Sequence, residues 1–280
     1  MDSNLTIELL EGALNTWNEK LSQLWTLLTT SPAEFRDGAI WQTIVTINDA
    51  LKAFALALLV LFFFASIFKT VGNMAELKRP ELIVKMLIRF VLARAVVIYG
   101  MDLMLAVFEI CQGIMATIGE SIGAIGAEPL VLPDAIRAKI LDTGFFERIP
   151  MTAVALIGSL GVTIMSFVLI LTVYGRFFKL YMYTAIAPIP LASFAGESTE
   201  STGKAFLRSY IGVCMEGAII MLAMLIFNGF AISPPDPTIN VGSTQMIWNY
   251  ISETIFNFLV LVIVVKGSDH ITKEMLGLSG

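Results

Sequence analysis

The chain has 280 residues, of which 56% are hydrophobic and only 15% are charged, and its formal net charge is −5. Its mean hydropathy is +0.80. Soluble domains are about half apolar and a quarter charged, so this composition argues against a water-soluble enzyme and predicts a surface that faces lipid. The acidic balance also argues against a protein that coats nucleic acid over its whole surface.

The first 45 residues are expected to form an amphipathic helix and a linker outside the membrane. Apolar residues recur there at alternating spacings of three and four, which is a heptad pattern; they are Ile7, Leu10, Leu14, Trp17, Leu21, Leu24 and Leu28. These seven residues are called the apolar seam below. Such a seam either contacts a partner helix in an oligomer or lies on the outer leaflet, and both readings are open.

Five stretches have the roughly 20 mostly apolar residues that a transmembrane helix needs. They cover residues 48–69, 95–119, 149–175, 210–232 and 245–265. A sixth apolar stretch, residues 180–196, is interrupted by Pro188 and Pro190, so a re-entrant or interfacial segment is expected. The sequence therefore predicts an all-α, polytopic helical membrane protein with a membrane domain at residues 46–266.

The distribution of Lys and Arg predicts the orientation in the membrane. Most of the 18 basic residues fall on the cytoplasmic side if the N-terminus lies outside and the C-terminus inside. Residues 120–148 are then an outer loop, and residues 267–280 are a cytoplasmic tail. This pattern predicts a multi-pass protein of the cytoplasmic (inner) membrane, in contact with membrane lipid.

Three acidic residues lie inside the predicted spans, where an unpaired charge is costly; they are Asp102, Glu109 and Glu216. Asp102 and Glu109 are seven residues apart and therefore share one helix face. They are expected to form structural ion pairs, to line a water-filled path or to couple proton movement. The candidate basic partners are Arg89, Arg94 and Lys204.

Small residues recur in the third span, at Ala155, Gly158, Ser159, Gly161 and Thr163. A face of small residues lets another membrane helix approach closely. This pattern predicts a packed helix bundle.

Four basic residues form a candidate inner rim, namely Lys78, Arg79, Lys204 and Arg208. Such a rim can meet the phosphates of DNA. The positive-inside rule explains the same residues without any ligand.

Signals for catalysis are weak. The single histidine, His270, has no second His or Cys cluster to complete a metal site, and Cys111 and Cys214 lie separately in apolar stretches. No phosphate-binding glycine loop is present, so ATP-driven work is assigned to another subunit. We expect no catalytic, cofactor-binding or metal-binding residues.

The segment after the third span resembles the TrbL-type polytopic membrane subunits of type IV secretion and conjugal transfer systems. The residues that carry the resemblance are Arg176 and Lys179, the break Ala187-Pro188-Ile189-Pro190, and the run Gly203-Lys204-Ala205-Phe206. The order of spans also fits nearly the whole chain. The short outer loop and tail look more like the compact version on conjugative elements of Gram-positive bacteria.

The resemblance implies a non-enzymatic inner-membrane channel or platform subunit. Such a subunit forms a homo-oligomer, assembles with other secretion-channel subunits and separate ATPases, and meets a DNA or protein substrate in transit. The alternative is a secondary transporter or export permease that acts as a monomer or dimer. The number of copies in the complex distinguishes the two hypotheses.

Overall fold

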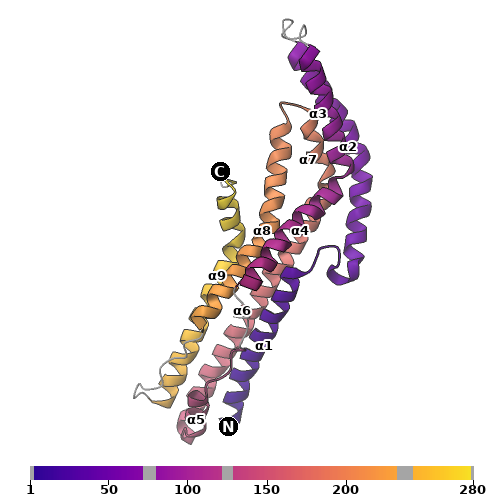
Figure 1. Cartoon of the computed structure of the whole chain (residues 1–280). Helices are drawn as coiled ribbons and strands as arrows, with labels where there is room; N and C mark the ends of the chain where they lie inside the picture. The colour runs from indigo at the N-terminus through magenta and orange to yellow at the C-terminus, as the bar shows by residue number, and fades with distance from the viewer. Residues whose placement is uncertain (1–2, 72–79, 122–128, 232–241, 279–280) are drawn as a thin grey trace. The chain divides into compact units, whose positions relative to one another are not determined.

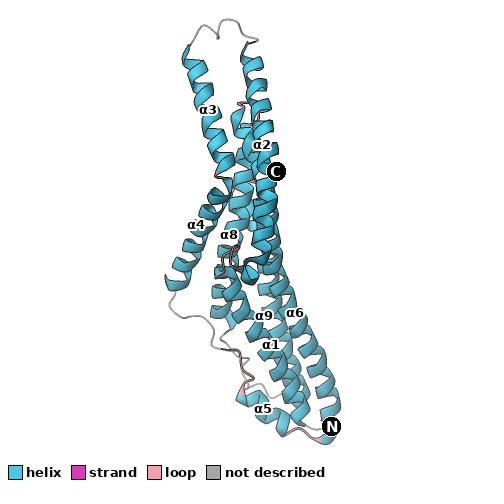
Figure 2. Ribbon diagram, turned by 90° about the vertical axis from the view of Figure 1, so that its right-hand side faces the viewer, coloured by secondary structure: helices cyan, strands magenta, loops and turns pink. Residues whose placement is uncertain are grey.

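The computed structural model describes residues 3–71, 80–121, 129–231 and 242–278. Within these ranges the regular structure is entirely helical, with no strand (Figure 2). The elements are α1 (Ser3–Thr29), η1 (Phe35–Gly38), α2 (Ala39–Val71), α3 (Pro80–Ile98), α4 (Gly100–Ser121), α5 (Asp134–Leu141), α6 (Phe145–Ile186), α7 (Pro188–Ala192), η2 (Ser193–Ala195), α8 (Glu200–Ala231) and α9 (Ser243–Met275). The predicted all-α class is confirmed.

Five helical segments in the described ranges are long and apolar enough to cross a membrane. They are Phe35–Lys69, Gly100–Gly119, Phe145–Ile186, Glu200–Gly229 and Thr244–Met275. Each overlaps one predicted span, so the polytopic architecture is confirmed. Four of these segments extend beyond their predicted spans, because a helix continues until its capping and turn residues stop it, whereas hydropathy marks only its apolar part. The exception is Gly100–Gly119, which begins five residues after the predicted start at residue 95.

Helix α3 was not predicted as a separate element. The second predicted span began at residue 95, but residues 95–98 belong to α3 and the chain turns at Tyr99 before α4. Lys85, Arg89 and Arg94 interrupt the apolar run of α3, which hides the helix from a hydropathy reading. Pro80 occupies its first position, where a missing N–H costs nothing.

The proline-interrupted segment breaks where the sequence indicates. Helix α6 ends at Ile186, and Pro188 and Pro190 fall in the first turn of α7, where proline is tolerated. Residues 180–186 belong to α6 and not to the broken segment, because both prolines lie after them. Whether the remainder re-enters the membrane stays a prediction.

The chain forms two compact units. The first unit contains residues 1–29, 115–175 and 217–268, and the second contains residues 30–114, 176–216 and 269–280. Helices α4, α6, α8 and α9 contribute residues to both units. Each unit is described by itself below.

The first unit is a bundle in which α1 packs on α6, α8 and α9 (Figure 1). The indole of Trp17 is fully buried and stacks on Phe258, with ring centroids 3.7 Å apart, and Phe227 lies on a second side at 6.1 Å. The hydroxyl groups of Thr6 and Thr152 form a hydrogen bond of 2.9 Å. These contacts fix α1 to the bundle along one face.

The loop before α6 is also tied to α1. The Asn18 amide donates to the carbonyl oxygen of Leu130 at 2.9 Å and accepts from its backbone N–H at 3.0 Å. Arg137 in α5 forms an ion pair with Glu11. The apolar side of α5 is buried, so this short helix is part of the packed first unit.

The second unit is built around α2, α3 and α7, which contact one another. Leu59, Val97 and Leu191 are buried in its apolar core. The buried Asn48 amide donates to the Thr184 carbonyl oxygen at 2.7 Å, and the Tyr210 hydroxyl donates to the Met104 carbonyl oxygen at 2.9 Å. Such buried polar bonds add directional ties to a bundle that lacks a strong hydrophobic drive in lipid.

The small-residue face of α6 allows α9 to approach closely in the first unit. A Cβ atom added at Gly158 would lie 2.5 Å from Cγ2 of Ile251, whereas one added at Gly161 would lie 3.6 Å from Cδ1 of Ile255. The first distance is a clash and the second is an ordinary contact. Gly158 therefore sets how closely α9 packs against α6.

This geometry predicts opposite outcomes for two alanine substitutions. We expect Gly158→Ala to destabilise the protein by about 1–3 kcal/mol through overpacking. Gly161→Ala is the matched control and should be neutral or stabilising by up to about 1 kcal/mol, since alanine favours a helix. Thermal unfolding of the purified protein in detergent measures both, and equal transition temperatures for the two variants would contradict the close approach.

Candidate functional site

A fully buried arginine marks the centre of polar interactions in the second unit. The Arg176 side chain in α6 donates from Nε to the carbonyl oxygen of Val213 at 3.1 Å and from Nη2 to that of Cys214 at 3.0 Å. Its guanidinium carbon lies 5.8 Å from the ring centroid of Phe108. Carbonyl lone pairs and the aromatic face together stabilise a cation that lies inside the protein.

A chain of ion pairs lies near Arg176. Lys179 in α6 contacts Glu216 in α8 at 3.4 Å and Asp269 in α9 at 3.1 Å. Asp269 also pairs with Lys273 at 2.9 Å. We call these five residues, including Arg176, the charge cluster.

The charge cluster connects α6, α8 and α9 within the second unit. Its three cations face two anions, which leaves one positive charge in excess. Nη1 of Arg176 has no hydrogen-bond partner among the described residues. Such a network orients helices, because a single broken pair leaves a buried charge alone.

Glu216 therefore has a partner that the sequence did not indicate. The predicted candidates were Arg89, Arg94 and Lys204, but the carboxylate contacts Lys179. The two residues are 37 positions apart on different helices, and no local spacing connects them. In the sequence, Lys179 was noted only as one of the residues that carry the family resemblance.

Asp102 and Glu109 lie on one exposed face of α4, as their spacing predicts. Neither carboxylate forms an ion pair or hydrogen bond within the part of the chain that the structure describes. Two of their predicted partners are used elsewhere: Glu200 contacts Arg89 at 2.8 Å and Lys204 at 2.5 Å. The expected structural ion pairs of Asp102 and Glu109 are thus not found, because Glu200 takes these two cations.

The candidate basic inner rim is only partly described. Lys78 and Arg79 lie outside the described residues. Lys204 is paired with Glu200, and Arg208 is exposed on α8. A role of this rim toward DNA stays a prediction.

The apolar seam of α1 packs inside its own chain. Six of its residues are buried, and Leu21 is half-buried. Trp17 stacks on Phe258, and Leu10 and Leu14 face α6 and α9. The prediction that the seam contacts another subunit is wrong, because the seam's own chain supplies the apolar surface that it needs.

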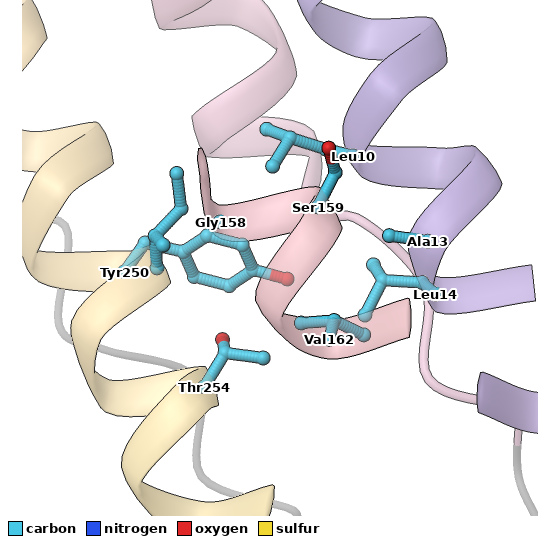
Figure 3. A pocket seen from close by; sticks show the side chains of 9 residues that line it. Leu10, Ala13, Leu14, Gly158, Ser159, Val162, Tyr250 and Thr254 are labelled. Atoms are coloured by element: carbon cyan, nitrogen blue, oxygen red, sulfur yellow. The ribbon is translucent and has the colours of Figure 1, made fainter. Parts of the chain in front are cut away.

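A small apolar pocket lies where α1, α6 and α9 meet (Figure 3). The ring of Tyr250 extends into it from α9, and the other walls include Leu14, Ser159 and Val162. Its cavity volume is about 20 Å³, which is close to the space that one water molecule needs. This pocket is a packing gap and neither a ligand site nor a conduit.

The fold defines the class of a polytopic helical membrane protein. The family model described as "TrbL/VirB6 plasmid conjugal transfer like protein" matches residues 17–188, which is more than half of the chain. The chain therefore belongs to this family, and it is a component of a conjugal transfer system. The matched range includes Arg176, Lys179 and Pro188, and it ends before Pro190 and before the run Gly203-Lys204-Ala205-Phe206. No curated protein and no solved structure matches the chain.

The charge cluster makes a prediction about stability. Lys179→Met removes the cation beside Glu216, whose side chain is only 3% exposed, and we expect a loss of up to about 3 kcal/mol. The matched control is Lys204→Met, which removes an exposed surface ion pair and should cost less than about 1 kcal/mol. Unfolding in detergent measures both.

A double variant makes the test specific. Lys179→Met combined with Glu216→Leu removes both charges, so it should be more stable than Lys179→Met alone. If the double variant is the less stable one, the stabilising role of the pair is refuted.

Proposed function

We propose that the protein is a non-enzymatic, oligomeric channel or platform subunit of a type IV secretion or conjugal transfer machine. Membership in the TrbL/VirB6 family supports a place in such a machine. The five apolar helices suit a subunit that builds a membrane structure. Separate ATPases supply energy, and the substrate in transit is DNA or protein.

One observation carries the oligomeric part of the proposal: α4 exposes two carboxylates on a membrane-spanning helix. A charged side chain at the centre of a lipid-facing helix costs about 2.5–3.5 kcal/mol. Glu109 lies near the middle of the Gly100–Gly119 span, whereas Asp102 lies in the first turn of α4. Asp102 and Glu109 find no partner in the described part of their own chain. Contact with a neighbouring subunit, or with water held between subunits, removes that cost.

The neighbouring helix offers a complementary charge. Arg94 in α3 is exposed and has no ion-pair partner among the described residues. A second copy of the chain that brings its Arg94 against Asp102 or Glu109 would neutralise both surfaces. A secondary transporter would instead need its acids inside its own bundle, facing the substrate path.

The proposal includes an orientation. The N-terminus lies outside and the C-terminus inside the cytoplasmic membrane, which keeps most basic residues on the inner side. In this orientation the exposed Arg208 is available to an inner partner or to the substrate, whereas Lys204 is paired with Glu200.

The test measures the number of copies in the assembly and the effect of replacing the two α4 carboxylates by neutral amides. Native mass spectrometry of the detergent-extracted protein should show more than two copies, and Asp102→Asn with Glu109→Gln should weaken the assembly and lower the frequency of transfer. Glu147→Gln is the control, because Glu147 is an exposed acid in the first turn of α6. It should leave both measurements unchanged.

Two outcomes would count against the proposal. A monomeric or dimeric wild-type protein would favour the secondary transporter or export permease. Intact assembly and transfer in the double neutral variant would remove the role of the α4 carboxylates.

A further inference from the structure

Two free cysteines meet in the core of the second unit. Cys111 in α4 and Cys214 in α8 are far apart in the sequence, and neither forms a disulfide. They are 3% and 0% exposed and belong to the same buried apolar cluster. Their side chains form a hydrogen bond with each other. The fold thus brings together two thiols that lie in separate apolar stretches of the sequence.

A neighbouring hydrogen bond gives the alignment of α4 and α8 at the cysteine pair. The Tyr210 hydroxyl donates to the Met104 carbonyl oxygen at 2.9 Å and so ties the two helices together. Cys111 follows Met104 by seven residues, and Cys214 follows Tyr210 by four. Residues at these spacings share one face of a helix. The two cysteines therefore face each other where α4 and α8 meet.

The guanidinium group of Arg176 lies beside the pair. It donates from Nη2 to the backbone carbonyl oxygen of Cys214, and its carbon lies 5.8 Å from the ring centroid of Phe108, one turn before Cys111. Nη1 of this buried side chain has no hydrogen-bond partner among the described residues. The cation interacts electrostatically with both cysteines. A neighbouring cation stabilises a thiolate, which is the form of cysteine that reacts with oxidants.

The same cation argues against a metal ion at the pair. A soft ion such as Cu(I) is bound by thiolates, but here it would add a second positive charge beside Arg176. Within the part of the chain that the structure describes, no group of three or more His, Cys, Asp or Glu side chains could hold a metal ion. The pair is therefore better suited to a reaction between its two sulfur atoms.

We propose that Cys111 and Cys214 are a redox-active dithiol that closes to an intramolecular disulfide between α4 and α8. The oxidant is a small neutral peroxide, since the pair is buried and apolar side chains surround it. One thiolate attacks a peroxide oxygen, the O–O bond breaks, and a sulfenic acid and one water form. The second thiol attacks the sulfenic sulfur, the S–S bond forms, and a second water leaves. Two electrons and both thiol protons thus pass to the peroxide.

The disulfide would add a covalent tie between α4 and α8. It closes a loop of about 100 residues, which restricts the unfolded chain and raises the stability of the folded one. The tie would hold α4, the helix that carries Asp102 and Glu109, at a fixed position on α8. Both sulfur atoms belong to one chain, so the inference does not depend on the number of copies in the assembly.

The test begins with the wild-type protein. Membranes that contain it are treated with dilute hydrogen peroxide, denatured, and labelled with a maleimide polymer that adds mass at each free thiol. We expect both thiols to become unreactive together and dithiothreitol to restore both. Mass spectrometry should find the peptides of Cys111 and Cys214 joined. In detergent, the transition temperature of the oxidised protein should rise by about 5–10 °C.

A relocated thiol is the matched control. Cys111→Ala combined with Met104→Cys moves the thiol two turns along the same buried face of α4, from a position 3% exposed to one 0% exposed. The displacement is about 10 Å, which is beyond the reach of a disulfide. The wild-type pair should therefore close at least about tenfold faster than the relocated pair, because only its sulfurs are in position to react.

Four results would overturn the inference. Two thiols that stay reactive after peroxide treatment would show that the pair does not close. A disulfide between two chains would show that other thiol contacts are preferred, and oxidation that dithiothreitol does not reverse would indicate sulfinic acid. These three results come from the wild-type protein and need no variant to fold. Equal rates for the wild-type and relocated pairs would contradict the alignment of α4 on α8.

Discussion

The structure depends on one constraint: lipid cannot solvate a charge, so every charged or polar side chain in a spanning helix needs protein or water beside it. The charge cluster meets this constraint inside the chain. Arg176 bonds to two helix carbonyls, and Lys179 lies between Glu216 and Asp269. These contacts determine how α6, α8 and α9 pack in the second unit.

The same constraint applies to the charged groups that the chain leaves exposed. Asp102 and Glu109 on α4 face away from the described core of their own unit. In water such faces would need no explanation. On a helix of a membrane protein an exposed acidic face is the observation behind the proposed oligomeric role in conjugal transfer.

The sequence predicted the spans well because hydropathy is a local property. The charge-free apolar core of α2 and the long apolar run of α6 are visible without any tertiary information. The family resemblance was also visible, since its residues around Arg176 and Pro188 lie in one segment. Helix α3 was missed because Lys85, Arg89 and Arg94 interrupt its apolar run.

The contacts of the candidate site were not predictable, because their partners are far apart in the sequence. The heptad pattern of α1 correctly predicts an amphipathic helix. It does not reveal that Trp17 stacks on Phe258 of the same chain, and not on another subunit. Likewise, Lys179 and Asp269 are 90 residues apart. Periodicity shows that a face is buried, and only the fold shows what buries it.

The central claim is that another copy of the chain covers the acidic face of α4. A photo-crosslinking amino acid in place of Glu109 tests it most directly, in membranes that contain the complete machine. We predict a covalent product with two copies of the chain. Phe54, a 67% exposed residue of α2, is the control position and should give a lower yield. A probe at position 109 that captures only lipid would contradict the claim.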